Sequence, residues 1–304
     1  MNERVRALAE KIVPRPLLIK GWEVYCRWRA RKALRVFRQA PETPAYLDRK
    51  MLERLQKEYP PVKWDYLYDE DSLAQRGRER AEMMLEFIPE GRQTVNRFLD
   101  LGAWDGMCCA ALEQMGKETV GIDIRAEGFT DVARHSGVDF LQMDAADLGF
   151  EANSFDFIFS FNSFEHFPEP DRVLGEAVRV LRPGGYIYLD FGPLYWSAKG
   201  SHQFRTIHVP YHQCLFTKET LTEFAADEGI ELMGFFWMNE WRVDQYRQLW
   251  QDHAHHLETL FYYETLNAVH VDLITHYPSC FKSKAKDFDN FLVAYIELLF
   301  QKRR

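Results

Sequence analysis

Long apolar runs are missing from this sequence. Although 46% of the 304 residues are hydrophobic, no stretch reaches the roughly 20 consecutive apolar residues that a membrane-spanning helix needs. The first residues, Met1 to Arg4, also lack the apolar core of a secretory signal peptide. We therefore expect a soluble protein of the cytoplasm.

Cysteine is scarce, and positive charge is in deficit. The five cysteines are an odd number that includes the adjacent pair Cys108 and Cys109, which argues against a disulfide framework and fits a reducing compartment. The formal net charge of −8 argues against strong general attraction to nucleic acid, although a local basic patch is compatible with it. Eleven basic residues are concentrated near the N-terminus: Arg4, Arg6, Lys11, Arg15, Lys20, Arg27, Arg29, Arg31, Lys32, Arg35 and Arg38.

One stretch combines a short apolar segment, an acidic residue and glycines. Arg97 to Leu101 has the pattern of a buried strand and contains Asp100, and a turn with Gly102 and Gly106 then leads into a helix. Glycine lets the backbone turn tightly and approach a ligand that a Cβ atom would obstruct. A second strand pattern, Val120 to Asp123, ends in a carboxylate where doubly wound folds hold ribose hydroxyls. Together these features predict a nucleotide-cofactor site.

Three further motifs follow in order. Met143 to Leu148 comes after a third strand pattern, Ser154 to Phe167 contains a fourth, and Val178 to Leu189 closes a helix and opens a fifth. The ordered set resembles the class I S-adenosylmethionine-dependent methyltransferases over roughly residues 95–192. It departs from the family at Trp104, which replaces the middle glycine of the G-x-G-x-G loop and gives a G-x-W-D-G variant. The Trp104 ring either packs structurally or faces the sulfonium in a cation–π contact.

The resemblance implies a fold and a cofactor. We expect an α/β fold with a doubly wound, seven-stranded, mostly parallel sheet (a Rossmann-like methyltransferase fold) that binds S-adenosyl-L-methionine at the carboxyl ends of its strands. Strand six is expected at Ile230 to Met238 and strand seven at Phe291 to Phe300, with a helix begun by Thr217 before them. The expected organisation is a helical N-terminal cap (1–92), a core (93–238) with a lid (193–215), a mainly helical insertion (239–290) that partners the cap, and the final strand with the C-terminus (291–304).

The resemblance also assigns cofactor contacts residue by residue. The backbone from Gly102 to Gly106, together with Trp104 and Asp100, should surround the methionine part of the cofactor, and Asp123 should accept hydrogen bonds from both ribose hydroxyls. The alternative for both carboxylates is a capping or surface role.

The adenine end and the methyl end are assigned in the same way. Asp144 and the backbone of Ala145 should meet the adenine edge. Phe161 and Asn162 lie just past the fourth strand, where the family borders the cofactor and the transferred methyl group.

The acceptor side of the site rests on histidines. Methyl transfer from a sulfonium is an in-line displacement, so the protein mainly aligns the acceptor and removes its proton where the acceptor is a hydroxyl. A histidine suits that step near neutral pH. His166 at the mouth of the sheet and His212, which precedes a Phe-Thr pair in the lid, are the candidate bases, and a structural role is the alternative for each.

Two other groups of residues have ligand or nucleophile chemistry. In the segment Asp252 to His256, His253 and His256 would share a helix face while His255 would point away, so we expect no metal site. Cys108 and Cys109 are expected to be buried as small hydrophobic residues.

The basic N-terminal region has two interpretations. In Gly21 to Gln39, apolar residues recur close to one helical face while arginines crowd the rest. The helix either packs on the main domain with solvated arginines, or it contacts an anionic membrane or a phosphorylated substrate. The apolar face consists of Trp22, Cys26, Ala30, Ala33 and Phe37.

The sequence therefore predicts a methyltransferase acting on a small-molecule or glycan-like acceptor, at oxygen. Modification of tRNA or another RNA is the first alternative, because the N-terminal arginines could engage phosphates. A catalytically inactive binding or scaffold protein is the second. An NAD-dependent dehydrogenase would share the glycine loop and Asp123, but Arg179 to Gly185 and Glu165-His166 match methyltransferases better. The acceptor and the oligomeric state are not encoded in recognisable motifs.

Overall fold

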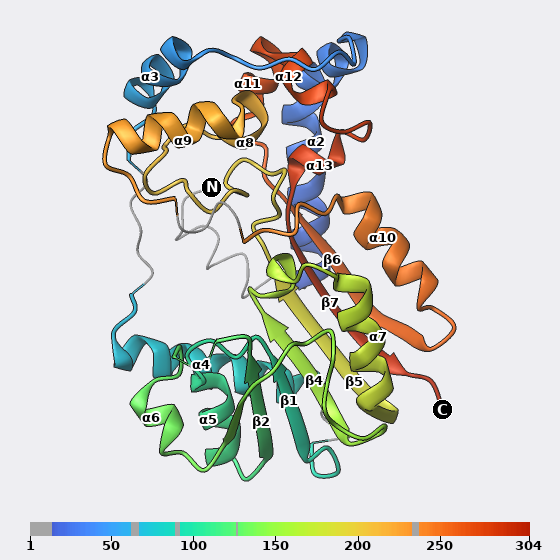
Figure 1. Cartoon of the computed structure of the whole chain (residues 1–304). Helices are drawn as coiled ribbons and strands as arrows, with labels where there is room; N and C mark the ends of the chain where they lie inside the picture. Colours follow the sequence, from blue (N-terminus) through green and yellow to red (C-terminus); the bar gives the residue numbers. More distant parts are fainter. Residues whose placement is uncertain (1–13, 62–66, 89–91, 126, 233–236) are drawn as a thin grey trace. The chain divides into compact units, whose positions relative to one another are not determined.

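The structure is a computed structural model that describes residues 14–61, 67–88, 92–125, 127–232 and 237–304. Its central feature is a seven-stranded sheet with the order β3-β2-β1-β4-β5-β7-β6 (Figure 1). The strands are β1 Arg97–Leu101, β2 Glu118–Asp123, β3 Asp139–Gln142, β4 Phe155–Phe161, β5 Leu181–Phe191, β6 Leu257–Leu266 and β7 Val293–Lys302. The helices are α2 Arg15–Gln39, α3 Arg49–Glu58, α4 Glu70–Glu86, α5 Met107–Gln114, α6 Asp131–Arg134, α7 Pro170–Val180, α8 His212–Leu215, α9 Lys218–Asp227, α10 Val243–Asp252, α11 Val271–His276, α12 Pro278–Lys282 and α13 Asp289–Leu292, with a 3₁₀ turn η1 at Phe164–His166.

The first five strands are parallel neighbours. β1 lies between β2 and β4, so that Asp100 pairs with Gly121 on one side and Phe159 on the other. β2 also pairs with β3, and β4 with β5, in the parallel sense. The carboxyl ends of parallel strands meet at one edge of a sheet, which is where doubly wound folds bind ligands. The predicted fold class is confirmed.

The chain divides into two compact units. Unit 1 consists of Met1–Val62, Pro193–Tyr246 and Tyr263–Ile296. Unit 2 consists of Lys63–Gly192, Arg247–Tyr262 and Glu297–Arg304. The predicted cofactor motifs therefore all fall in unit 2, whereas His212 falls in unit 1.

Unit 2 is built on a hydrophobic core beneath helices α4 and α5. Phe98, Phe157 and Phe159 from the strands are fully buried and join a cluster with residues of both helices. Helix α4 approaches α5 closely at Gly77, where an added Cβ would collide with the carbonyl of Met107. Cys108 and Cys109 are buried in this core, as expected. Burial raises the pKa of both thiols well above the ordinary value.

Unit 1 is organised around helix α2, which packs against α11 and α12. The indole Nε1–H of Trp22 donates to the carbonyl of Leu266 at 2.7 Å. Helix α2 therefore packs on residues of the predicted insertion, with a buried face made of Cys26, Ala30, Ala33 and Phe37.

Two predicted elements near the C-terminal half have different outcomes. Helix α9 begins after Thr217, whose hydroxyl accepts from the backbone N–H of Thr220, as the sequence predicts. The predicted sixth strand at Ile230 to Met238 is wrong over its described residues, because 230–232 and 237–238 are not in a strand, and 233–236 lie outside the described part. The sixth strand is β6, which lies inside the segment predicted to be a mainly helical insertion.

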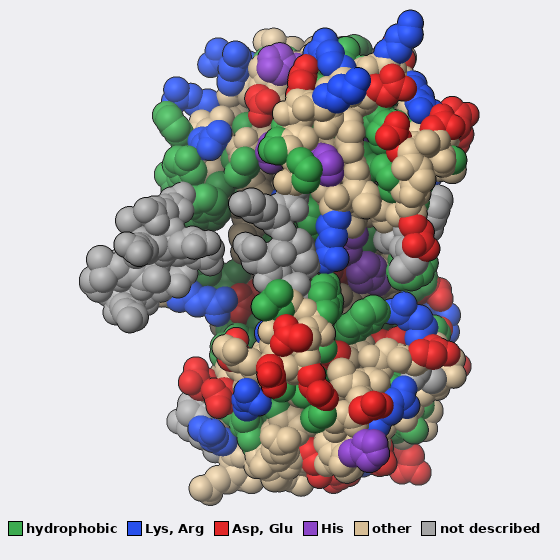
Figure 2. All heavy atoms as spheres, turned by 90° about the vertical axis from the view of Figure 1, so that its left-hand side faces the viewer, with side chains coloured by type: hydrophobic (Ala, Val, Ile, Leu, Met, Phe, Trp, Pro, Cys, Tyr) green, Lys and Arg blue, Asp and Glu red, His purple; other side chains and the backbone are tan. Residues whose placement is uncertain are grey.

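The surface carries charges of both signs. Figure 2 shows acidic and basic side chains interspersed over the face in view, together with apolar side chains that in places lie side by side. Among the described residues, no helix combines the length and the apolar character that crossing a bilayer requires.

Candidate cofactor and active site

The loop between β1 and α5 has a strained backbone. Gly102 and Gly106 have φ values of +80° and +75°, which glycine adopts at little cost. Trp104 between them has φ +46°, a conformation that is uncommon for a residue with a bulky side chain. Strained backbone of this kind clusters at functional sites. The loop therefore has a left-handed backbone at position 104, although Trp104 carries a large side chain there.

The Trp104 side chain is 47% exposed, so it does not belong to the core. Its indole ring already faces a cation, since the guanidinium of Arg125 lies 4.8 Å from the ring centroid. The ring thus has one cation–π partner within the chain, and its contact with the sulfonium stays a prediction.

Asp123 ends β2 and turns its carboxylate toward this loop. Its Oδ2 accepts from the backbone N–H of Trp104 at 3.2 Å, and its Oδ1 accepts from that of Arg125 at 3.0 Å. Each carboxylate oxygen has two lone pairs and can accept a second hydrogen bond. The Nε of Arg125 also forms a longer ion pair with Oδ1, at 4.0 Å. A pair of adjacent hydroxyls, such as those of a ribose, fits this arrangement.

Asp100 lies in β1 and is only 4% exposed. Burial raises the pKa of Asp100 to about 8, while a hydrogen bond from the Cys109 thiol and the charge of Arg80 oppose the rise. The carboxyl group is therefore largely protonated at neutral pH unless a cation approaches it.

The end of β4 carries Phe161 and Asn162. Phe161 is 8% exposed, and the guanidinium of Arg80 from α4 lies 4.4 Å from its ring centroid. Asn162 is exposed with φ +50°. Its backbone N–H donates to the backbone carbonyl of Asp190. Asparagine tolerates this left-handed backbone better than most residues.

Asp144 and Ala145 follow β3. The Asp144 side chain is exposed, and its Oδ1 accepts from the backbone N–H of Ala146 at 2.9 Å. Ala145 is 5% exposed. The predicted adenine contacts therefore lie in a short turn just after the end of a strand that is parallel to β2.

Sequence reasoning missed Ser163 and Arg80. The Ser163 hydroxyl donates to the carbonyls of Gly102 at 3.0 Å and Phe161 at 3.1 Å, and so ties the two strand-end loops together. A Cβ on Gly102 would lie 2.6 Å from that of Ser163. For Ser163, the available signal in the sequence was a hydroxyl residue directly after the fourth strand. For Arg80, it was the glycine at position 77, one helical turn earlier in an otherwise helical segment.

Glu165 and His166 form the 3₁₀ turn after β4. Glu165 is 1% exposed, and its Oε1 accepts from the backbone N–H of Gly192 at 3.1 Å. Its Oε2 has no hydrogen-bond partner within the part of the chain that the structure describes. Burial raises the pKa of Glu165 to about 8. His166 is half-buried beside it, with its backbone N–H bonded to the Ser163 carbonyl.

His212 opens α8 in unit 1 and is 1% exposed. Its Nδ1 lies 2.9 Å from the carbonyl of Val209, so Nδ1 carries the proton. Its Nε2 lies 2.6 Å from the Ser201 hydroxyl, which must then donate to it. Burial lowers the pKa of His212 to about 4. The ring is therefore held as one neutral tautomer with both nitrogens bonded internally.

The structure brings the predicted cofactor residues to the ends of four parallel strands, with the loop after β1 bonded to Asp123 at the end of β2. A family model described as "Methyltransferase domain" matches residues 99–189, the segment that contains these strands. This segment is a class I S-adenosylmethionine-dependent methyltransferase domain. Its cofactor is S-adenosylmethionine. The individual contacts of the cofactor remain predictions.

Similar proteins share this methyltransferase domain over part of their length. The biotin biosynthesis bifunctional protein BioHC of Cellvibrio japonicus is 34% identical over 127 residues, which are 40% of this chain and 25% of that protein. A ubiquinone biosynthesis O-methyltransferase of Mesorhizobium japonicum is 26% identical over 174 residues, or 50% of this chain and 66% of that protein. Among solved structures, the PH0226 protein of Pyrococcus horikoshii OT3 aligns with a TM-score of 0.45 and 20% identity over 74% of this chain and 91% of that one.

Proposed function

We propose that this chain transfers a methyl group from S-adenosylmethionine to a hydroxyl oxygen of a small-molecule or glycan-like acceptor. The observation that carries the proposal is the Glu165-His166 pair in the turn after β4. This turn follows the strand whose end carries Phe161 and Asn162, and Ser163 bonds it to the glycine loop. A histidine at such a position is suited to removing a hydroxyl proton.

Each residue has a separate role in this proposal. When bound, the cofactor supplies an electrophilic methyl group. Asp123 holds its ribose, the loop from Gly102 to Gly106 lines its methionine part, and Asp144 with the Ala145 backbone borders its adenine. His166 accepts the proton of the acceptor hydroxyl, and the bond between Glu165 and Gly192 fixes the turn that carries it.

His212 has a structural role in the proposal. A base needs a free lone pair, but the Nε2 lone pair of His212 accepts from Ser201. Burial lowers its pKa to about 4, which makes it a weak base at neutral pH. We therefore retain His166 alone as the candidate base.

Two further observations support oxygen as the acceptor atom. The Mesorhizobium japonicum relative has a name that describes an O-methyltransferase, and that name concerns the relative itself. After the fourth strand this chain reads Ser160-Phe161-Asn162-Ser163, which differs from the Asn-Pro-Pro-Tyr or Asp-Pro-Pro-Tyr motif of the amino-methyltransferases that act on DNA bases.

A labelling experiment tests the proposal directly. The full chain is incubated with methyl-labelled S-adenosylmethionine and fractionated cell extract, and the labelled product is identified by mass spectrometry. We expect label in a small hydroxylated compound or glycan as a methyl ether. Label in RNA would favour the RNA-modifying alternative, and cofactor binding without any labelled product would favour the scaffold alternative.

The salt dependence of the reaction separates the acceptor classes. Binding to a nucleic acid through several phosphates falls steeply as salt rises. A neutral small acceptor makes no such phosphate contacts. We therefore expect an apparent KM that changes little between about 0.05 and 0.3 M salt, a range over which the Debye length changes about 2.4-fold.

We also propose a cytoplasmic location. All five cysteines are free and buried in the structure, which suits a compartment that keeps thiols reduced. Fractionation of cells followed by immunoblotting checks this assignment.

A further inference from the structure

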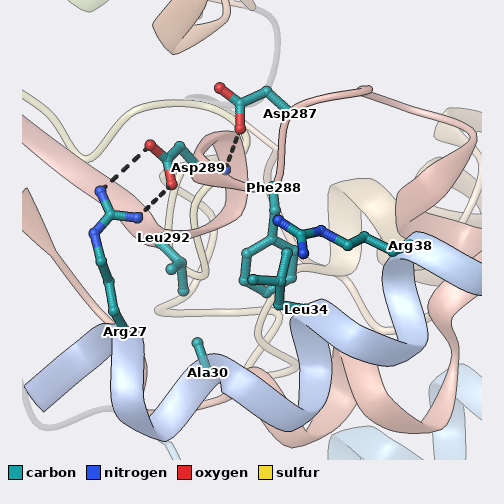
Figure 3. Close-up of a pocket in the computed structure, with 8 residues that line it drawn as sticks. All are labelled: Arg27, Ala30, Leu34, Arg38, Asp287, Phe288, Asp289 and Leu292. Carbon is teal, nitrogen blue, oxygen red and sulfur yellow. Dashed lines mark hydrogen bonds and ion pairs between the residues drawn. The ribbon is translucent and has the colours of Figure 1, made fainter. Parts of the chain in front are cut away.

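Helix α2 uses one of its faces for packing inside unit 1. Arg27 on the flank of this face forms an ion pair with Asp289, at 2.9 Å between Nη1 and Oδ1. Figure 3 shows that Ala30 and Leu34 of α2 line a small cavity together with residues of α13 such as Leu292. The volume of this cavity is about 160 Å³. The inward side of the helix therefore already has its partners.

A second apolar stripe runs along the opposite face of α2. Leu17, Val24 and Trp28 are 61%, 63% and 57% exposed. Each stands nine residues before a residue that is buried on the inward face of α2. The buried residues are, in the same order, Cys26, Ala33 and Phe37. Nine residues are about two and a half helical turns, so the two stripes point in opposite directions. Exposed apolar side chains that cluster in this way mark an interaction surface.

Basic side chains accompany the outward stripe. Lys20, Arg31, Lys32 and Arg35 are exposed, and the guanidinium of Arg31 lies 4.9 Å from the centroid of the Trp28 ring. The helix contains eight Lys or Arg residues and one acidic residue, so its formal charge is 8 − 1 = +7 within a chain of −8. The acidic residue, Glu23, is bonded to Arg27 at 2.8 Å.

We propose that the outward face of α2 binds the surface of an anionic lipid bilayer. We name this surface, made of Leu17, Val24, Trp28 and the basic residues around them, the α2 outer face. A helix with Trp and Leu on one face and flanking Lys and Arg lies in the headgroup region, where its apolar side chains enter the acyl boundary and its cations meet lipid phosphates. From Leu17 to Arg35 the helix is long enough to contact the surface over about 27 Å.

Charge decides against a second copy of the chain as the partner. In a symmetric dimer the same patch meets itself, so two helices of charge +7 would face each other. An anionic bilayer instead supplies the opposite charge. The inference does not depend on the acceptor, because the α2 outer face lies in unit 1 and includes none of the proposed cofactor or base residues.

The test uses flotation of the full chain with lipid vesicles. Vesicles of phosphatidylcholine with phosphatidylglycerol are compared with vesicles of phosphatidylcholine alone. Arg31→Glu with Lys32→Glu removes the charge complementarity, and Val24→Ser with Trp28→Ser removes the apolar contact. The matched control is Lys50→Glu with Lys57→Glu, which makes the same change of charge at exposed positions of α3 in the same unit.

We expect binding to the anionic vesicles only. The Arg31/Lys32 variant should lower the partition coefficient at least about tenfold at 0.1 M salt, since each cation near an anionic surface contributes to binding. The Val24/Trp28 variant should abolish the binding that persists at 0.5 M salt, whereas the control should bind like the parent chain. Circular dichroism of each variant should show an unchanged helix content, because all four side chains are exposed.

Several results would overturn the inference. These are equal binding to neutral vesicles, no binding to anionic vesicles at low salt, or an equal loss in the α3 control. If light scattering showed a dimer of the parent chain and a monomer of the Val24/Trp28 variant, the partner of the α2 outer face would be a second copy of the chain and not a bilayer. If the chain bound heparin as tightly as it binds anionic vesicles, and the Val24/Trp28 variant kept that binding, the α2 outer face would be a general site for polyanions.

Discussion

The turn after β4 in unit 2 and the short helix α8 in unit 1 both bury an ionisable side chain, but they leave it in different chemical situations. Burial favours the neutral form in both cases, because it raises the pKa of Glu165 to about 8 and lowers that of His212 to about 4. The His212 ring has both nitrogens bonded to Ser201 and Val209, whereas Oε2 of Glu165 has no partner among the described residues.

The difference separates a structural group from a group at a reactive site. Internal bonds to both ring nitrogens make His212 part of the packing of unit 1, since breaking them would leave buried polar groups unpaired. An unsatisfied buried carboxyl oxygen costs free energy, and a catalytic role is one of the explanations for such a group in a native protein. The match of His212 to a sequence motif therefore does not make it a base, because its Nε2 lone pair accepts from Ser201.

The largest expected effect comes from replacing the two histidines. With a hydroxyl acceptor, His166→Ala should lower kcat by roughly 10²–10⁴-fold. His212→Ala should instead lower the free energy of unfolding by about 1–3 kcal/mol, because Ser201 and Val209 lose their buried partner. Steady-state kinetics and urea unfolding of both variants measure the two effects. If His212→Ala lowered kcat and left the free energy of unfolding unchanged, the structural role of His212 would be contradicted.

Replacing the carboxylate at the end of β2 tests the cofactor half of the site. Asp123→Ala should weaken S-adenosylmethionine binding at least about tenfold, because two hydrogen bonds to a charged acceptor are worth on the order of 2–4 kcal/mol. Asp139→Ala is the matched control, because Asp139 is an exposed carboxylate at the start of β3. Isothermal titration calorimetry that finds unchanged affinity in a folded Asp123→Ala protein would contradict this role.

The contact between α4 and α5 is tested by two glycine substitutions. Gly77→Ala should destabilise the protein by about 1–3 kcal/mol, since the new methyl group collides with the Met107 carbonyl. Gly175→Ala in α7 has open space around it and should stabilise the protein by about 0.5–1 kcal/mol through helix propensity. Thermal unfolding of the pair measures the difference, and equal melting temperatures would mean that α4 shifts without cost.

The last comparison concerns the pH dependence of stability. The pKa of Glu165 rises from its ordinary 4.5 to about 8 in the folded protein, so the folded state binds more protons than the unfolded state between these values. Its contribution to stability is therefore complete below about pH 4.5 and is lost as the pH rises toward 8, at up to about 1.4 kcal/mol per pH unit. Asp100 adds a contribution of the same sign.

Glu165→Gln should flatten part of that slope, because glutamine resembles the protonated acid at every pH. Urea unfolding between pH 5 and pH 8 is the measurement, and those limits lie within the interval between the two pKa values. An unchanged slope would mean that Glu165 is ionised in the folded protein.

The sequence was sufficient where local chemistry alone determines the structure. The glycines at 102 and 106 predict left-handed turns because glycine alone adopts them cheaply, and the Thr217 side chain predicts the start of α9. It was insufficient for β6, because Leu257 to Leu266 contains leucine and glutamate beside aromatic residues, so its pattern fits a helix as well as a strand.

The remaining features depend on contacts between distant parts of the chain. Arg80 lies over Phe161 only because α4 packs on α5 at Gly77. His212 matches a motif, but its neutral state follows from the positions of Val209 and Ser201. The apolar character of Trp28 is visible in the sequence, whereas its direction away from the packed face needed the structure.

The position of β7 in the sheet has a consequence for how the chain is made. β7 lies between β5 and β6, yet it begins at Val293, long after β5 ends at Phe191. During synthesis, one edge of β5 therefore stays without its neighbour until β7 has left the ribosome. An open strand edge is a template for wrong pairing, so a chain that stops before Val293 should aggregate or require a chaperone even though its cofactor motifs are complete.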